Sequence, residues 1–239
     1  MALLGGFKIN KAIDVLLMAD QKGIVEVKEA LVKIKDAGAS AVPKLIEALA
    51  DDPNNTYINN LLFELLTNQT LPEYMDALAD EDKHIVSGVM AVLAKSSAYD
   101  PNLLLELFTD PDIPNNVLVK ILLARSNKLN GNNLFALLPK VDNPSQKAIL
   151  HVIEETVSEN MIPQLAKYAD SDDINIRYQI SKIFGKLDTE RSRNILLQKL
   201  EDPSKKVRQA AIEGLGNMTV PVPSNLICKS LRDSDMTVQ

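Results

Sequence analysis

Apolar residues along the chain fall into short clusters at helical spacing, and polar breaks rich in Asp, Pro and Asn separate these clusters. Six such breaks follow one another, at 50–55, 79–84, 109–116, 141–146, 169–175 and 201–206. Asp at an N-cap accepts hydrogen bonds from the free N–H groups of the first helical turn, and Pro at the first helical position loses no bond. Each break therefore predicts the end of one helix and the start of the next.

Two amphipathic segments alternate with these breaks. The first segment of each repeat is short, at 41–50, 71–79, 101–109, 132–141, 161–169 and 191–200. The second segment starts with an apolar position that recurs every 28 to 32 residues, at Tyr57, Ile85, Val117, Ala148, Ile176 and Val207. In this alignment Arg125 falls where Leu215 stands in the clearest repeat. The spacing predicts a helix pair per repeat, with the recurring position in the core.

The pattern extends to both ends of the sequence. Residues 9–20 and 23–38 resemble one more helix pair, and the phrase Asp202-Pro-Ser-Lys-Lys-Val-Arg returns 31 residues later as Asp233-Ser-Asp-Met-Thr-Val-Gln. We expect one domain over residues 1–239: an N-terminal capping helix pair at 1–38, six repeats at 41–217 and an incomplete terminal repeat at 219–239. The incomplete repeat suggests that the parent chain continues with more repeats or another domain after Gln239. Alternatively, its bare helix pairs with another subunit or a partner.

Helix pairs this short cannot bury their apolar faces alone, but stacked pairs share a continuous core. The predicted fold is therefore all-α, a right-handed α-solenoid of about seven helix pairs plus an incomplete last one. Small residues in the last second segments would let neighbouring helices approach closely: Gly185, Ala210, Ala211, Gly214 and Gly216.

Two stretches carry a family resemblance. VPKLIEALADDP (42–53) and LEDPSKKVRQAAIEGLG (200–216) resemble HEAT repeats, especially the short bacterial kind also found in phycobilin lyases. The resemblance implies that Arg177 and Arg208 each bond an Asp of the neighbouring repeat. The other second segments carry an apolar residue at that place, such as Ile58 and Leu118, which predicts no such ladder between 57 and 150.

Composition and charge narrow the function. Hydrophobic residues make up 46% of the chain, aromatic residues only 4%, and Trp is absent. A net charge of −6 disfavours general binding to nucleic acid. The single cysteine, Cys228, excludes an intramolecular disulfide, and we expect it to be a small buried hydrophobe. With no secretory signal and no long apolar run, a cytoplasmic protein without a membrane span is expected.

No catalytic, cofactor or metal site is expected. The two histidines, His84 and His151, lie in different repeats, and neither is followed by Glu, as the His-Glu pairs of di-iron HEAT-like proteins would require. Glycine-rich phosphate loops and GxSxG motifs are also absent from the sequence. We therefore do not expect an enzyme, although lyase-type activity stays open through the family resemblance.

The predicted function is a non-catalytic scaffold that binds another protein, or the regulatory repeat region of a longer protein. Its partner-binding residues should line the concave face formed by the second helices: Asn59, Asn60, Ser87, Lys120, His151, Tyr178, Gln179, Lys182, Gln209 and Glu213. Two alternatives stay open. One is a bilin-lyase-type chaperone for chromophore attachment, and the other is a nucleic-acid-binding module that uses a basic cluster of Lys199, Lys205, Lys206 and Arg208.

Charge is unevenly distributed along the sequence. Nine acidic residues and no Lys or Arg lie between Glu47 and Asp82, whereas nine basic and four acidic residues lie between Arg177 and Arg208. Opposed charges of this kind steer a partner and fix its orientation. The partner can include a second copy of the chain.

Overall fold

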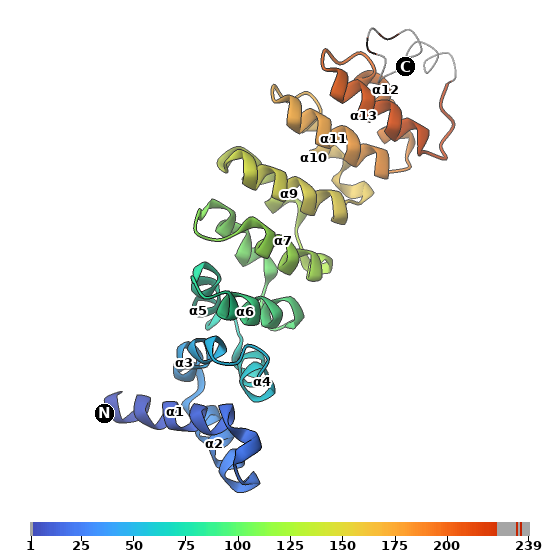
Figure 1. The fold of residues 1–239 in the computed structure, drawn as a ribbon. Coiled ribbons are helices and arrows are strands. Elements are labelled where there is room, and N and C mark those ends of the chain that lie inside the picture. The colour runs from blue at the N-terminus through green and yellow to red at the C-terminus, as the bar shows by residue number, and fades with distance from the viewer. Residues whose placement is uncertain (1, 224–232, 234, 236–239) are drawn as a thin grey trace. The chain divides into compact units, whose positions relative to one another are not determined.

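The computed structural model describes residues 2–223, 233 and 235, with side chains from residue 6 onward. This part of the chain contains thirteen α-helices, short 3-10 helices and no strand (Figure 1), which confirms the all-α prediction. No described helix combines the length and apolar character that a membrane span needs. Cys228 and most of the predicted incomplete repeat at 219–239 lie outside the described residues.

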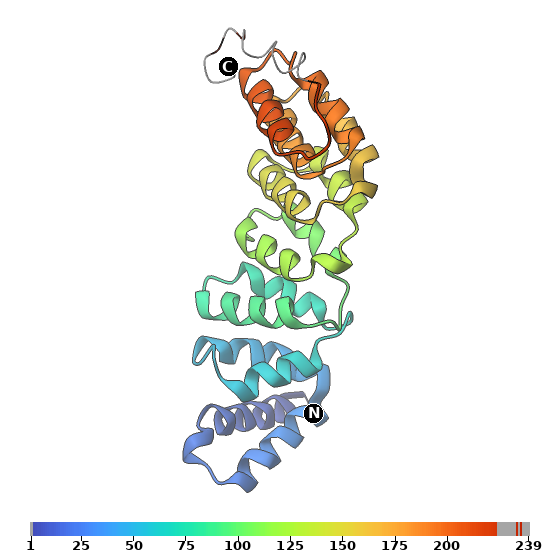
Figure 2. The ribbon, with the colours of Figure 1, turned by 90° about the vertical axis from the view of Figure 1, so that its right-hand side faces the viewer.

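The chain divides into two compact units, Met1–Leu129 and Asn130–Gln239, and the prediction of one domain stays a prediction. The first unit is a succession of helix pairs that follow one another as layers (Figures 1 and 2). Its pairs are α1 (Ala2–Leu17) with α2 (Ile24–Ala37), α3 (Val42–Glu47) with α4 (Thr56–Leu65), α5 (Leu71–Asp76) with α6 (Lys83–Lys95), and the 3-10 helix η5 (Pro101–Thr109) with α7 (Asn115–Ala124).

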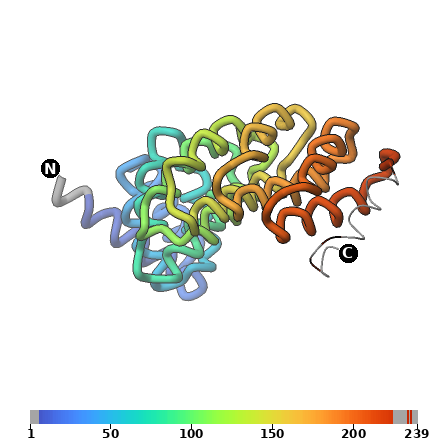
Figure 3. The backbone as a smooth tube through the Cα atoms, turned by 90° about the horizontal axis from the view of Figure 1, so that it is seen from above, coloured from blue at the N-terminus to red at the C-terminus, as the bar shows by residue number. Residues whose placement is uncertain are grey.

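The second unit, taken by itself, is also a succession of helix pairs (Figure 3). Its pairs are α8 (Gly131–Leu137) with α9 (Asn143–Thr156), α10 (Ile162–Tyr168) with α11 (Ile174–Lys186), and α12 (Glu190–Lys199) with α13 (Lys205–Gly216). All six predicted repeats at 41–217 thus contain two helical segments each. Two details differ from the prediction: α1 begins at Ala2 rather than at residue 9, and η5 is a 3-10 helix over its whole length.

Polar side chains start most second helices as predicted. The carboxylates of Asp82, Asp142 and Asp173 accept hydrogen bonds from backbone N–H groups in the first turns of α6, α9 and α11, at 2.7–2.9 Å. Helix α13 is an exception, because its N-cap is Ser204, whose side chain makes no capping bond. Asp202 lies two residues before this N-cap, and its carboxylate accepts hydrogen bonds from Arg177 of the preceding helix pair.

The buried positions correct the predicted register of the second helices. Helices α9, α11 and α13 each bury two residues at matching positions, and each position lies 31 residues after its equivalent in the preceding second helix. These pairs are Ile149 and Ile153, Ile180 and Phe184, and Ala211 and Leu215. Tyr57 was predicted in the core, but it is 38% exposed, and the next residue, Ile58, is fully buried instead. The same 31-residue step assigns Leu122, not Arg125, to the position of Leu215.

Tyrosines of first helices tie the pairs together. The Tyr74 hydroxyl on α5 donates to the carbonyl of Leu62 on α4 at 2.7 Å. In the second unit the Tyr168 hydroxyl on α10 donates to the carbonyl of Phe135 on α8 at 2.8 Å, and the two rings stack with centroids 5.7 Å apart. Each of these bonds satisfies a polar group within an apolar contact, since burial without a partner is costly.

Helices α11 and α13 lie side by side and come very close at two glycines (Figure 1). A Cβ built on Gly185 would stand 2.7 Å from the Cα of Gly214, a distance that real Cβ contacts essentially never show. Because the obstacle is backbone, no side-chain rotation could relieve it. The prediction that small residues allow close approach is thus confirmed at this crossing, whereas a Cβ on Gly216 would meet no atom within 4 Å.

We therefore expect Gly185→Ala to lower the free energy of unfolding of the second unit by roughly 1–3 kcal/mol, because α11 and α13 must separate. Gly216→Ala is the matched control at the end of α13. It should be neutral or stabilising by up to ~1 kcal/mol, since Ala is the better helix former. Urea denaturation followed by circular dichroism measures both. Equal stability of the two variants would contradict the close helix contact.

Arg125, at the end of α7, is buried although it carries a charge, and only 9% of the residue is exposed. Its Nε and Nη2 atoms are buried and have no hydrogen-bond partner among the described residues. The position two repeat steps later is Leu187, which is also buried. A buried guanidinium with unpaired donors opposes folding, because it loses water without gaining a carboxylate.

Replacement of Arg125 by Leu should therefore stabilise the first unit, by roughly 1–3 kcal/mol. The change in thermal unfolding should exceed that of Lys120→Leu, which removes an exposed charge from the same helix. A loss of stability in Arg125→Leu would show that the guanidinium makes a favourable interaction.

Candidate functional site

All ten predicted partner-binding residues lie on second helices and are accessible to solvent. Five are exposed: Asn60, Ser87, Lys120, His151 and Glu213. Five are half-buried: Asn59, Tyr178, Gln179, Lys182 and Gln209. These residues are therefore available for contact with a partner, while their role in binding stays a prediction.

Three of these residues occupy the same position of consecutive helices. His151 on α9, Lys182 on α11 and Glu213 on α13 follow one another at the 31-residue step that the buried positions define. Ion pairs already cross this surface, because the Lys182 Nζ lies 3.6 Å from the Glu154 carboxylate of α9. Gln209 and Glu213 bond each other at 2.9 Å within α13. Much of the polar surface of the second unit is therefore satisfied internally.

The first unit offers a groove on its second helices. It has a volume of about 330 Å³ and is lined by α4 with the turn before it and by α6: Pro53, Asn54, Thr56, Asn59, Asn60, Phe63, Ala91, Val92 and Lys95. Two predicted residues, Asn59 and Asn60, lie together in it, and Ser87 lies one helical turn before Ala91 on α6. Lys120 is not among the lining residues, nor are the six predicted residues of the second unit.

Asn59 and Asn60 differ in whether their side-chain amides are hydrogen-bonded within the protein. The Asn59 amide nitrogen donates to the carbonyls of Pro53 and Asn55, both at 2.9 Å, which holds this side chain against the start of α4. Asn60 makes no hydrogen bond to the described residues, so its amide can both donate and accept. Phe63, one turn after Asn59, is 44% exposed and adds an apolar surface.

Phe63 and Lys95 are the groove residues that sequence reasoning missed. Phe63 stands six residues after Tyr57, the same spacing as Lys182 after Ile176 and Glu213 after Val207, but the predicted set contains only polar residues. Lys95 is the last residue of α6, and no motif marks it. An exposed aromatic in a chain with 4% aromatic residues is the signal that could have pointed to this groove.

The predicted basic cluster is largely neutralised by carboxylates. The Nζ of Lys199 lies 2.5 Å from Asp170 and that of Lys205 lies 2.9 Å from Asp235, while the Arg208 guanidinium bonds Asp233 at 2.6 and 2.8 Å. Only Lys206 has no ion pair within the described residues. The Lys199 side chain is in addition only 9% exposed. This arrangement leaves little positive charge for phosphate groups.

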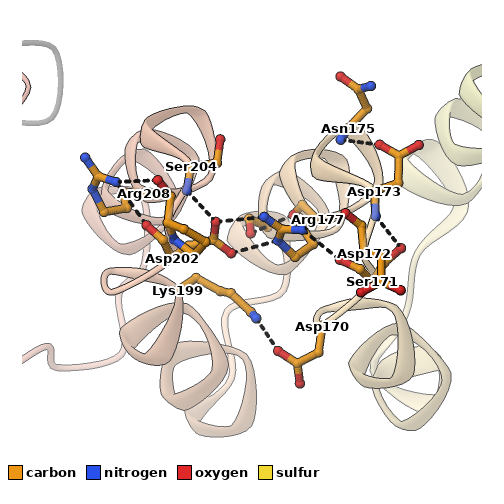
Figure 4. A network of polar contacts seen from close by, with 12 residues as sticks. Asp170, Ser171, Asp172, Asp173, Asn175, Arg177, Lys199, Asp202, Ser204 and Arg208 are labelled. Atoms are coloured by element: carbon orange, nitrogen blue, oxygen red, sulfur yellow. Dashed lines mark hydrogen bonds and ion pairs between the residues drawn. The ribbon is translucent and has the colours of Figure 1, made fainter.

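Arg177 of α11 joins two consecutive helix pairs through Asp202 (Figure 4). Its Nε and Nη2 donate to the two carboxylate oxygens at 2.8 and 3.1 Å, and its Nη1 donates to the Ser171 carbonyl at 2.8 Å. Arg208 repeats the arrangement 31 residues later, with Asp233 and the carbonyl of Asp202. The Arg–Asp ladder that the family resemblance implied is thus present at both predicted arginines. Side-on bidentate pairs of this kind fix orientation as well as distance.

The Arg177–Asp202 ion pair shifts the pKa of the Asp202 carboxyl group. Burial raises the pKa of the Asp202 carboxyl, but hydrogen bonds from Arg177 and from the Ser204 N–H outweigh it, so the pKa lies below its ordinary value. The Arg208 guanidinium likewise lowers the pKa of Asp233. Since each folded-state pKa is depressed, the charged acids stabilise the fold above the pKa of an unfolded Asp, about 3.9, and this stability is lost as the pH falls further.

A hollow of about 340 Å³ lies beside the Arg177–Asp202 pair. Six charged residues line it, and four of them, Asp170, Arg177, Lys199 and Asp202, are engaged in the ion pairs just described; the other two are Asp172 and Glu201. Over the described residues, no three or more His, Cys, Asp or Glu side chains are grouped so that they could hold a metal ion. These features assign the hollow to the ladder between the repeats.

Asp202→Asn should therefore weaken the second unit at neutral pH by roughly 2–3 kcal/mol, because a buried guanidinium loses its charged partner. Its free energy of unfolding should also fall less steeply than that of the unsubstituted protein as the pH drops below about 4. Asp172→Asn, which neutralises an exposed carboxylate nearby, is the control and should keep the neutral-pH stability. Parallel pH profiles for Asp202→Asn and the unsubstituted protein would refute the proposed linkage.

Comparison with known proteins adds a family and a set of distant folds. The family described as HEAT repeats matches residues 162–239, a range that starts at the first residue of α10. No curated protein matches the chain.

Three solved structures are similar at low identity. Human deoxyhypusine hydroxylase in complex with glycerol shares 16% identity over 98% of this chain and 94% of its own, with a TM-score of 0.39. A homology model of the full-length AP-3 complex in an intermediate open conformation shares 19% over 99% of this chain and 49% of its own, with a TM-score of 0.35. The designed armadillo repeat protein YIII(Dq)4CqI shares 15% identity over 88% of this chain and 100% of its own, with a TM-score of 0.30. Likeness this distant carries no argument about function.

The family match and the ladder geometry cover the same helices. Both arginines of the ladder, Arg177 and Arg208, fall inside the matched range. Residues 162–239 thus match the family described as HEAT repeats, and this part of the chain contains both arginines of the ladder.

Proposed function

We propose that the chain is a non-catalytic scaffold that binds another protein through the exposed surface of its second helices. The observation that carries this proposal is the groove of about 330 Å³ between α4 and α6, in which two of the predicted partner-binding residues lie. HEAT repeats in general mediate contacts between proteins, which supports the same reading. The groove combines the aromatic ring of Phe63, the amide group of Asn60 and the ammonium group of Lys95, a mixture suited to a polypeptide partner.

The alternatives receive less support from the side chains. The nucleic-acid reading depends on Lys199, Lys205, Lys206 and Arg208, of which three are held by aspartates. No described contact or hollow favours chromophore attachment. A role as the N-terminal or regulatory region of a longer protein, self-association through the terminal helix and a cytoplasmic location stay predictions.

The proposal is tested by site-specific photocrosslinking in cells. A crosslinking residue at Ser87 of α6 should capture a partner, whereas one at Glu106, exposed on the first-segment helix η5, should not. The captured protein is then purified, and its affinity is measured by calorimetry.

In that measurement Ser87→Trp should weaken binding at least about tenfold, an energy of about 1.4 kcal/mol. Glu106→Trp should leave the affinity unchanged, and both variants should keep the circular dichroism spectrum of the unsubstituted protein. If Glu106→Trp were the variant that weakened binding, the recognition surface would lie on the first helices and the proposal would fail.

A further inference from the structure

The first helix pair carries most of the exposed apolar side chains of the described residues. Of the nine large hydrophobic residues that are clearly exposed, five belong to residues 7–32: Phe7, Met18, Ile24, Val25 and Val32. Three of these five lie on α2, where Ile24 is 72%, Val25 64% and Val32 57% exposed. Exposed apolar surface gathered in one place marks a contact with another protein.

Helix α2 is covered on one side only. It is the outer helix of the first unit, because it packs on α1, which in turn contacts α3 and α4 (Figure 1). Helix α6, of nearly the same length, lies between α4 and α7 and buries residues toward both. The buried residues of α6 are Ile85, Gly88, Val89, Val92 and Leu93, whereas those of α2 are Val27, Ala30 and Ile34. The outward side of α2 therefore has room for a further helix.

The outward side of α2 has a charge pattern that is complementary to itself. At about 100° per residue, Val25 and Val32 lie on one line along the helix, on the side opposite its buried residues. A basic line follows one flank of these valines and an acidic line follows the other, both with the same spacing of seven residues. The basic line is Lys28 with Lys35, the acidic line is Glu29 with Asp36, and all four side chains are exposed.

Contacts within the chain leave these charges accessible. The Glu29 carboxylate lies 3.7 Å from the Nζ of Lys33, and the Nζ of Lys35 lies 2.7 Å from the Glu64 carboxylate, with every one of these side chains more than half exposed. Exposed ion pairs of this kind contribute little to stability, so they do not prevent the same charges from pairing across a contact. Lys28 and Asp36 form no ion pair within the described part of the chain.

We propose that two copies of this chain associate through α2, with the two helices parallel and Val25 and Val32 packed along the seam. A two-fold axis parallel to the helices brings the basic flank of each α2 to the acidic flank of the other, so that Lys28 lies beside Glu29 of the partner subunit. An antiparallel pair would instead bring like charges together. None of the residues on this face lines the groove between α4 and α6, so the contact is independent of the proposed partner-binding surface.

Sedimentation equilibrium of the full chain tests this contact. Protein concentrations that cover Kd values from about 1 µM to about 1 mM should show an equilibrium between monomer and dimer. Val25→Ser should raise the dimer Kd at least about tenfold, a change of about 1.4 kcal/mol. Ile174→Ser is the matched control, because Ile174 is also exposed in the first turn of its helix, α11, and this variant should leave the Kd unchanged. Both variants should keep the circular dichroism spectrum of the unsubstituted protein.

Charge variants then test the orientation of the two helices. Lys28→Glu and Glu29→Lys, each alone, place like charges across the contact, and each should raise the dimer Kd at least about tenfold. An equimolar mixture of the two variants should recover the dimer, because each substituted side chain then faces an opposite charge. Lys83→Glu makes the same charge change at an exposed position of α6 and should leave the Kd unchanged.

Three results would overturn the proposal: no dimer at concentrations up to about 1 mM, a dimer that Val25→Ser does not weaken, or charge variants that remain monomeric when mixed. Tighter association of Lys28→Glu with the unsubstituted protein than of the unsubstituted protein with itself would also overturn it, since an antiparallel pair predicts that result.

Discussion

The burial of short helices against the next pair of helices is the constraint on which the rest of the structure depends. Helix α3 has six residues and α10 has seven, far below the length at which an isolated helix is stable in water. Their buried residues, such as Leu45 and Leu165, reach full burial only because neighbouring helices cover them. Each pair is therefore a structural unit that exists through its neighbours, and a defect at one contact should spread to adjacent pairs before it reaches distant ones.

The two units meet this constraint with different polar devices. In the second unit Arg177 and Arg208 connect consecutive pairs through bidentate carboxylates, and the close crossing of Gly185 with Gly214 brings the second helices together. In the first unit the 31-residue step assigns Asn115, not an arginine, to the place of Arg177. Asn59 of α4 likewise donates to the carbonyls of Pro53 and Asn55 and not to a carboxylate of the next pair. Arg125 is the costly exception there, since its Nε and Nη2 donors are buried without a hydrogen-bond partner among the described residues.

The sequence was sufficient to predict the helix pairs, because their breaks use Asp, Asn and Pro for reasons that are local. It was also sufficient for the ladder, once the family resemblance placed Arg177 and Arg208. The predicted register of the buried positions was wrong by one residue at Tyr57 and by about one helical turn at Arg125. A helix of ten residues can turn either face toward the core, and contacts with neighbouring helices decide which face is buried. The groove could be predicted only in part: Asn59 and Asn60 followed from helical spacing, but Phe63 was passed over as an apolar residue and Lys95 had no pattern around it.

Repeat architecture also explains why recognition can concentrate in the first unit. The exposed positions of a second helix are not needed for stacking, so their chemistry can change with little cost to the fold. In the second unit, Lys182 and Lys186 form ion pairs with Glu154 that join α11 to α9, so these exposed positions take part in stacking and are less free to change. In the first unit, most acids between Glu47 and Asp82 are left without such pairs. Some of these acids still stabilise the fold locally, as Asp82 does by capping α6, while their like charges add mutual repulsion to the unit.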